Sequence, residues 1–327
     1  MSWRKPVEFR SRLGVNYLWH LLAAARVGYD SDYADRYRQS VDADAINVLE
    51  RHGARIRFGN GETGSLTSLL AFLPGWLRLE SHEALRGYLD TAEYCLECGS
   101  FAPLAAAFPD ANWEDPWYLH LPGHRFQPAP AETLAFHEIA ECYVRNFERY
   151  ATAVWPVARA AMETRRLQLA TWFARRDLIA DWERYLSIPF LAPRYEIMLC
   201  YSNRGGPDYN SLGYDGNLFF YDKPFKQTCH FVSHEIGTHI LGQVKKAVDD
   251  AGRHAPGIVY RAFEDMVMFL NERVLGVERL AYTLPPTFEH AAMLSFCAAS
   301  YQDPFQLVTL LDRAADFLAK KAAHGRH

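Results

Sequence analysis

Apolar residues recur at the spacing of an α-helix along most of the N-terminal half of this chain. The segments with this pattern are residues 15–55, 66–72, 81–98, 131–155 and 157–186. Gly53 is placed to end the first of them, because glycine is the usual residue just past a helix. Pro156 separates the last two, since proline cannot donate the backbone hydrogen bond that a continuous helix needs. The sequence therefore predicts a mainly helical N-terminal region at 1–186.

Two segments of the same half lack a regular pattern. Residues 58–64 are rich in glycine but match neither G-x-G-x-x-G nor a P-loop, so they are predicted to form a loop. Residues 99–131 hold six prolines together with Trp113 and Trp117, and this composition also indicates irregular structure. A loop over an active site is one use of such a segment, because functional residues often lie on loops.

The C-terminal region, 187–327, combines strand-like and helical patterns. Two short runs of mostly apolar and aromatic residues, 195–201 and 216–221, are predicted strands because turn-forming segments flank them. Helices are expected after them at 225–251, 259–275, 288–300 and 304–322. The predicted fold is mainly α with a small β-sheet, an α+β protein in which the two regions form one compact unit.

Composition and charge narrow the class of protein. The 327 residues carry a net charge of −4, which gives no reason to expect nucleic acid or an anionic membrane as a partner. The N-terminus lacks the apolar run of a secretion signal, and no apolar run reaches the roughly 18 residues of a transmembrane helix. Six cysteines are too few for a disulfide framework in a chain of this length. We expect a cytoplasmic protein with no nucleic-acid and no membrane partner.

Three histidines and one glutamate lie close together in one predicted helix. His230, His234, Glu235 and His239 stand among apolar residues, so they are not an ordinary solvated face. In the zinc motif H-E-x-x-H, two histidines at i and i+4 bind the metal and the glutamate is the general base. Here the spacing is H-E-x-x-x-H, which leaves the two outer histidines roughly 140° apart on a regular α-helix. A π-turn at Gly237 would return both to one face, so a distorted metal helix is predicted.

Two other interpretations of this helix stay open. His230 and His234 lie at i and i+4 and need no distortion, but Phe231 then stands where the motif requires a glutamate. In the preferred register His230 is instead a substrate contact or supports a ligand from the second coordination shell. The remaining interpretation is a core helix whose histidines are hydrogen-bonded to other protein groups.

The sequence around this motif resembles a known family of metallopeptidases. His-Glu-Ile-Gly-Thr-His at 234–239 is similar to the signature of the tubulin tyrosine carboxypeptidase-like metallopeptidases, the family of the microtubule-associated tyrosine carboxypeptidases. Asn-Leu-Phe-Phe-Tyr-Asp-Lys-Pro-Phe at 217–225 resembles the strand and turn that lead into that family's metal helix. The resemblance covers residues 215–265 and implies a zincin-like metallopeptidase core with one bound Zn²⁺.

The resemblance also implies a role for each residue of the motif. His234 and His239 correspond to zinc ligands, and Glu235 corresponds to the catalytic glutamate. The family takes a third ligand, a glutamate, from a later helix, and Glu264 in the predicted helix 259–275 matches that position. The Gly-Leu that follows the family's glutamate is replaced here by Asp-Met.

Two other acids of the same helix compete for the place of third ligand. Glu264 is preferred because it begins a buried-looking helix and shares a face with Asn271, which could orient a ligand. Glu272 is the second choice and Asp265 the third.

The predicted function is that of a zinc-dependent hydrolase that cleaves a peptide or related amide bond. Zinc would activate a water, and Glu235 would act as the general base. The family resemblance favours a carboxypeptidase, which needs a cation for the substrate carboxylate, and Arg261 and Arg204 are the candidates. The alternatives are a metal-dependent biosynthetic or tailoring enzyme on the same scaffold and a non-catalytic helical protein with structural histidines.

Overall fold

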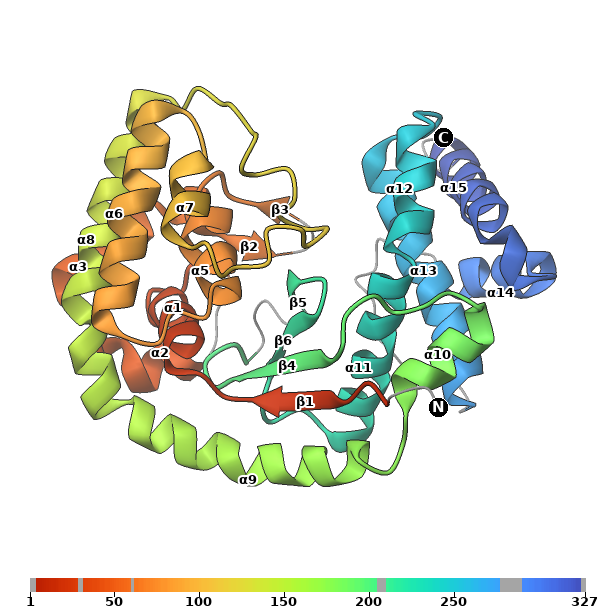
Figure 1. Cartoon of the computed structure of the whole chain (residues 1–327), viewed down its shortest axis with the longest axis horizontal. Helices are drawn as coiled ribbons and strands as arrows, with labels where there is room; N and C mark the ends of the chain where they lie inside the picture. The colour runs from red at the N-terminus through yellow and green to blue at the C-terminus, as the bar shows by residue number, and fades with distance from the viewer. Residues whose placement is uncertain (1–3, 29–31, 60–61, 205–209, 277–289, 325–327) are drawn as a thin grey trace. The chain divides into compact units, whose positions relative to one another are not determined.

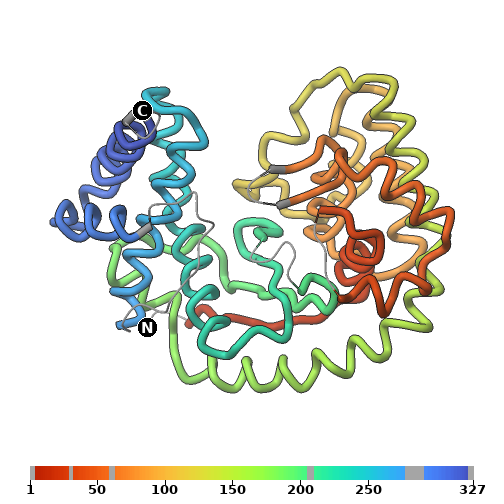
Figure 2. Tube along the Cα trace, turned by 180° about the vertical axis from the view of Figure 1, so that it is seen from behind, coloured from red at the N-terminus to blue at the C-terminus, as the bar shows by residue number. Residues whose placement is uncertain are grey.

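The computed structural model describes residues 4–28, 32–59, 62–204, 210–276 and 290–324, and it is mostly helical with a small sheet. This confirms the predicted α+β class. Two compact units divide the chain (Figures 1 and 2). We define the N-terminal unit as residues 8–171 and 196–222, and the C-terminal unit as residues 1–7, 172–195 and 223–327.

The boundary between these units differs from the predicted one at residue 186. The segment 196–222 was expected in the C-terminal region, next to the helix with the histidines, but it groups with the N-terminal residues. Its strands join the sheet that begins with β1 (Val7–Arg10), near the start of the chain. Because backbone hydrogen bonds of a sheet link strands that are distant in sequence, a boundary read along the chain misses this pairing.

Helices make up most of the N-terminal unit. They are α1 (Leu13–Ala24), α2 (Asp32–Tyr37), η1 (Arg38–Ser40), α3 (Ala43–Arg51), α4 (Gly53–Ile56), η2 (Ser68–Phe72), α5 (Leu73–Trp76), α6 (His82–Cys98), α7 (Ala102–Ala107), α8 (Pro130–Ala153) and α9 (Trp155–Phe173). α1 is buried on nearly every side and packs against α8, which also contacts α6. The core of this unit is therefore built around one buried N-terminal helix.

The main sheet has four strands in the order β1-β4-β6-β5. β4 (Tyr195–Cys200) runs parallel to β6 (Gly216–Phe220), and β5 (Asn210–Gly213) pairs antiparallel with β6 (Figure 1). Every residue of β4 and β6 is buried, as expected for strands covered on both faces. The predicted strands at 195–201 and 216–221 are confirmed.

The C-terminal unit consists of helices. They are α10 (Leu178–Leu186), α11 (Phe225–Ile240), α12 (Gly242–Asp250), α13 (Pro256–Leu275), α14 (His290–Ser300), η3 (Pro304–Gln306) and α15 (Leu307–His324). α13 is the central helix, in contact with α11, α14 and α15. Pro256 opens α13, and Gly276 ends it in the left-handed conformation at φ +65°.

Several local predictions were wrong. The glycine-rich residues 58–64 include two short antiparallel strands, β2 (Phe58–Gly59) and β3 (Glu62–Thr63), and the segment 99–131 contains α7. The strand β5 was not predicted. Gly53 lies just past the end of α3, as predicted, but it also begins the short helix α4. These elements are short, so pairing and packing with distant residues outweigh the local sequence pattern. Among the described residues, none of the helices combines the length and the apolar character that a bilayer crossing requires.

Candidate metal centre

α11 carries the histidine motif and is a regular α-helix from Phe225 to Ile240. The helical hydrogen bonding continues at its end, where the Leu241 N–H donates to the Gly237 carbonyl at 2.9 Å. The predicted π-turn is therefore absent from α11 as the structure describes it. On a regular helix His234 and His239 point in directions roughly 140° apart. A π-helical turn does occur in the described chain, at η2, where no residue of the motif lies.

Gly237 has a packing role instead of the predicted conformational one. A Cβ atom at this position would lie 2.5 Å from two ring carbons of Trp182, an indole on α10 that is fully buried. The same indole donates from Nε1 to Ser233 Oγ at 3.0 Å. Ser233 and Gly237 are four residues apart and share one face of α11. That face is consequently fixed against α10.

His234 meets Glu264 across the interface of α11 and α13. Its Nε2 lies 3.0 Å from Glu264 Oε2, and the two side chains are 4% and 27% exposed. His234 Nδ1 is buried and has no hydrogen-bond partner among the described residues. The structure thus brings together the first predicted ligand and the preferred third ligand, which are 30 residues apart in sequence.

One turn earlier on α11, His230 meets Met268 of α13. His230 Nε2 lies 3.0 Å from Met268 Sδ, and both residues are buried. Asn271 Nδ2 donates to the His230 backbone carbonyl at 3.0 Å, which ties the two helices together at this level. Asn271 therefore acts on the backbone of α11, whereas the sequence suggested a bond to a ligand side chain.

His239 and Glu235 lie on other parts of the α11 surface. The His239 ring is buried and packs edge-on against Tyr195, with ring centroids 5.2 Å apart. Thr238 Oγ1 donates to the Glu235 carbonyl at 2.7 Å and lies 3.4 Å from Glu235 Oε2. The Glu235 carboxylate thus has a hydroxyl of its own helix nearby.

The other two acids of α13 occupy different surroundings. Asp265 is 1% exposed, and burial together with this neighbouring carboxylate raises the pKa of the Cys297 thiol to about 12. Glu272 lies near the end of α13, where its backbone carbonyl accepts the capping N–H of Gly276. Neither is the acid that contacts His234 in the described structure.

The two arginines proposed for a substrate carboxylate differ in their settings. Arg261 lies on α13, three residues before Glu264, and donates from Nε to the Gly257 carbonyl of its own helix at 3.2 Å. Arg204 belongs to the N-terminal unit and forms an exposed ion pair with Asp32 at 2.8 Å. Of the two, Arg261 shares a helix with a predicted ligand.

The donor chemistry of this site suits zinc in part. Imidazole nitrogen and carboxylate oxygen are ordinary zinc ligands, and His234 and Glu264 present one of each. His239 does not join them, and no group of three or more His, Cys, Asp or Glu within the described ranges is arranged to hold a metal ion. The pair fits the metal, and completing the predicted ligand set requires a change in the turn between His234 and His239.

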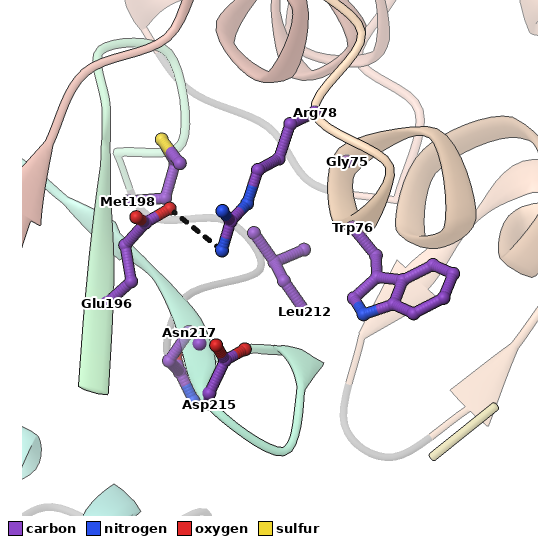
Figure 3. Close-up of a pocket in the computed structure, with 9 residues that line it drawn as sticks. Gly75, Trp76, Arg78, Glu196, Met198, Leu212, Asp215 and Asn217 are labelled. Atoms are coloured by element: carbon purple, nitrogen blue, oxygen red, sulfur yellow. Dashed lines mark ion pairs between the residues drawn. The ribbon is translucent and has the colours of Figure 1, made fainter. Parts of the chain in front are cut away.

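A separate pocket lies in the N-terminal unit, between α5 and the sheet (Figure 3). The buried Glu196 carboxylate stands 3.6 Å from the guanidinium groups of Arg78 and Arg12, so its charge is compensated. Trp76 and Asp215 contribute to the wall. This arrangement is an ion cluster in which two guanidinium groups face one carboxylate, and it holds none of the residues that the motif predicts.

Comparisons with known proteins found no relative of this chain. No family model, no curated protein and no solved structure matches this chain. Sequence reasoning placed Met268 on the face of Glu264 but missed its contact with His230, and it missed the contact of Trp182 with Ser233. Neither contact has a local signal, because each residue contacts α11 from another helix.

Proposed function

We propose that this protein is a zinc-dependent hydrolase that cleaves a peptide or related amide bond. The observation that carries the proposal is the 3.0 Å approach of His234 Nε2 and Glu264 Oε2 across two helices. The motif selects His234, and the helix face together with the family resemblance selects Glu264, both without reference to the structure. Catalytic zinc sites commonly include an imidazole and a carboxylate among their ligands, and His234 and Glu264 provide one of each.

His234, Glu264 and His239 would hold the zinc. The first two are in contact, and a rearrangement of the regular turn after His234 into a π-turn would bring the third to them. Bound zinc would supply Lewis acidity and lower the pKa of a coordinated water. Leu241 is the residue at which α11 passes into α12, so helical geometry already changes next to His239.

Glu235 would move the proton. Its carboxylate follows directly after His234 and is 8% exposed, so few water molecules compete for it. It would accept the proton of the attacking water and deliver it to the leaving nitrogen. Thr238 Oγ1, 3.4 Å from Glu235 Oε2, would help to hold the carboxylate in place.

A carboxypeptidase is the form of this activity that the resemblance favours. Arg261 precedes Glu264 by three residues on α13, so the two lie on neighbouring positions of one helix face. Its guanidinium would pair with the terminal carboxylate of a peptide. Arg261→Ala should then raise KM for a substrate with a terminal carboxylate and leave the amidated form of the same peptide unaffected.

The test combines metal content with hydrolysis. Full-length protein purified without chelator is analysed for zinc as wild type, Glu264→Gln and Glu272→Gln. The last is a matched control, because it makes the same exchange on the same helix. We expect about one zinc per chain in the wild type and in Glu272→Gln, and a loss of zinc in Glu264→Gln.

Hydrolysis is then measured on peptide libraries with Glu235→Gln as the control for catalysis. This variant should retain zinc and lose about 10²–10⁴-fold in activity. A folded wild type that neither contains nor takes up zinc would refute the proposed function. Full activity in Glu235→Gln would show that Glu235 is not the general base.

One observation favours a second candidate, a non-catalytic helical protein with structural histidines. His234 bonds directly to Glu264 within a regular helix, and such a bond by itself satisfies a buried imidazole nitrogen. Under this candidate Glu264→Gln and His234→Gln would alter stability only. The zinc analysis separates the two.

A further inference from the structure

Two pairs of side chains lie across the interface of α11 and α13, one helical turn apart. On α11, His230 and His234 are separated by four residues and share a face. On α13, Glu264 and Met268 are also separated by four residues. His234 Nε2 meets Glu264 Oε2 at 3.0 Å, and His230 Nε2 meets Met268 Sδ at 3.0 Å. The interface therefore presents two imidazoles, a carboxylate and a thioether side by side.

The contact of His230 with Met268 joins an imidazole nitrogen to a soft sulfur donor. A thioether sulfur is a weak acceptor, so a buried imidazole N–H gains little from it. His230 and Met268 are 3% and 4% exposed. Nearby, His234 Nδ1 and Asn271 Oδ1 are buried without a hydrogen-bond partner in the described structure. Polar atoms at this interface are thus only partly satisfied by protein groups.

Imidazole and thioether together are the donors of a soft transition-metal ion. Thioether ligands select Cu(I), whereas imidazole serves copper and zinc alike. We propose that the α11–α13 interface binds Cu(I) through His230, His234 and Met268, with Glu264 beside the ion. The inference rests on the proposed function in one respect, because the two metal sites share His234 and Glu264.

The two binding modes place different demands on α11. Histidines at i and i+4 share a face of a regular helix, so His230 and His234 need no additional residue between them to bind one ion. His234 and His239 need an additional residue in the intervening turn. The regular helix is accordingly the form that takes Cu(I), and the π-turn is the form that takes zinc. The ions compete for His234.

The test uses two buried methionines of the same helix. Met266 and Met268 both lie on α13, and exchange of methionine for leucine keeps the volume of a core side chain. Full-length apoprotein is titrated with Cu(I) under anaerobic conditions, in competition with the chromogenic chelator bicinchoninate. Cu(I) affinity should fall in Met268→Leu by at least the roughly 10–100-fold that loss of a supporting group costs. It should be unchanged in Met266→Leu.

Histidine variants then separate the two modes. His230→Gln should lose Cu(I) affinity as Met268→Leu does, whereas His239→Gln should lose zinc and keep Cu(I). Equal Cu(I) affinity in wild type, Met268→Leu and Met266→Leu would overturn the inference, and so would a wild type from which the chelator removes all Cu(I).

The two sites share His234, but each proposal can fail without the other. A wild type that binds Cu(I) through Met268 but takes no zinc would refute the hydrolase and support this inference. A wild type that binds zinc but no Cu(I) would refute this inference and leave the hydrolase intact.

Discussion

Two histidines, one in each unit, are almost equally buried and differ in what their ring nitrogens meet. His20 of α1 is 1% exposed and His234 of α11 is 3% exposed. His20 Nδ1 lies 2.7 Å from Tyr33 Oη, and its Nε2 lies 3.3 Å from Ser40 Oγ. Ser40 donates its own hydrogen to the Tyr37 carbonyl, so its oxygen accepts from His20 Nε2 and Tyr33 donates to Nδ1.

His234 has one charged partner and one nitrogen without a partner. Its Nε2 faces the Glu264 carboxylate, and its Nδ1 is buried with no hydrogen bond in the described structure. His20 is thus a neutral imidazole with both nitrogens used, which is typical of a structural residue. The difference teaches that burial alone does not distinguish a structural histidine from a ligand, and that the chemistry of the partners does.

The largest expected effect concerns His20 and pH. Burial lowers the pKa of His20 from 6.5 to about 3. Below pH 6.5, His20 therefore binds a proton in the unfolded chain but not in the folded protein. For this reason the free energy of unfolding falls as the pH drops from about 6.5 towards 3. The loss attributable to this residue is on the order of 5 kcal/mol.

Urea unfolding between pH 4 and 7 measures this effect. His20→Gln should show a flatter dependence of the unfolding free energy on pH than the wild type. Parallel pH dependences in the two proteins would mean that His20 is protonated in the fold, and the contrast with His234 would fail.

The second effect concerns how α11 is held. Gly237→Ala puts a methyl group 2.5 Å from the rigid, buried indole of Trp182. Overpacking of this kind costs about 1–3 kcal/mol, and we expect the upper end because neither partner can rotate away. Chemical denaturation of Gly237→Ala beside Gly87→Ala, a helical position of α6 where an added Cβ meets no atom within 4 Å, checks this. Equal stability of Gly237→Ala and wild type would show that α10 does not fix α11.

The third effect is the response of stability to zinc. A ligand that binds only the folded protein stabilises it by about 2.7 kcal/mol at a concentration 100-fold above Kd. Thermal unfolding should therefore shift upward with zinc in the wild type, in His20→Gln and in Glu272→Gln. Glu264→Gln should not respond. A response in Glu264→Gln as large as in the wild type would place zinc elsewhere.

The smallest effect sharpens the assignment at His20. Tyr33→Phe removes the hydroxyl that donates to Nδ1 and leaves a buried acceptor unsatisfied, which costs about 1–3 kcal/mol. Zinc uptake should not change. Calorimetry gives the stability, and zinc analysis gives the control. Loss of zinc in Tyr33→Phe would contradict a purely structural role for this cluster.

Much of the helical framework could be predicted because its signals are local. The periodicity of apolar residues and the positions of proline and glycine predict the break at Pro156, the strands at 195–201 and 216–221, and the helix with Glu264. The main-chain pairing of β1 with the later strands was missed, since it depends on residues nearly 190 positions apart.

The site was predictable in part for the same reason. Glu264 was chosen as the partner of His234 from its place on a helix face and from the family resemblance, and the structure places the two in contact. The π-turn was inferred from the spacing of His234 and His239 and placed at Gly237, but that glycine accommodates Trp182, which no local pattern shows. The contact of Met268 with His230 was likewise not predicted, because it depends on packing between two helices.

Histidine-selective ¹⁵N NMR of the ring nitrogens during a zinc titration tests the central claim most directly. Variants His20→Gln and His234→Gln assign the two residues. The account predicts that the His234 signals change with one equivalent of zinc, while the His20 signals stay those of a neutral imidazole. His234 signals that do not respond to zinc, in a protein whose His20 signals also stay constant, would show that both histidines are structural.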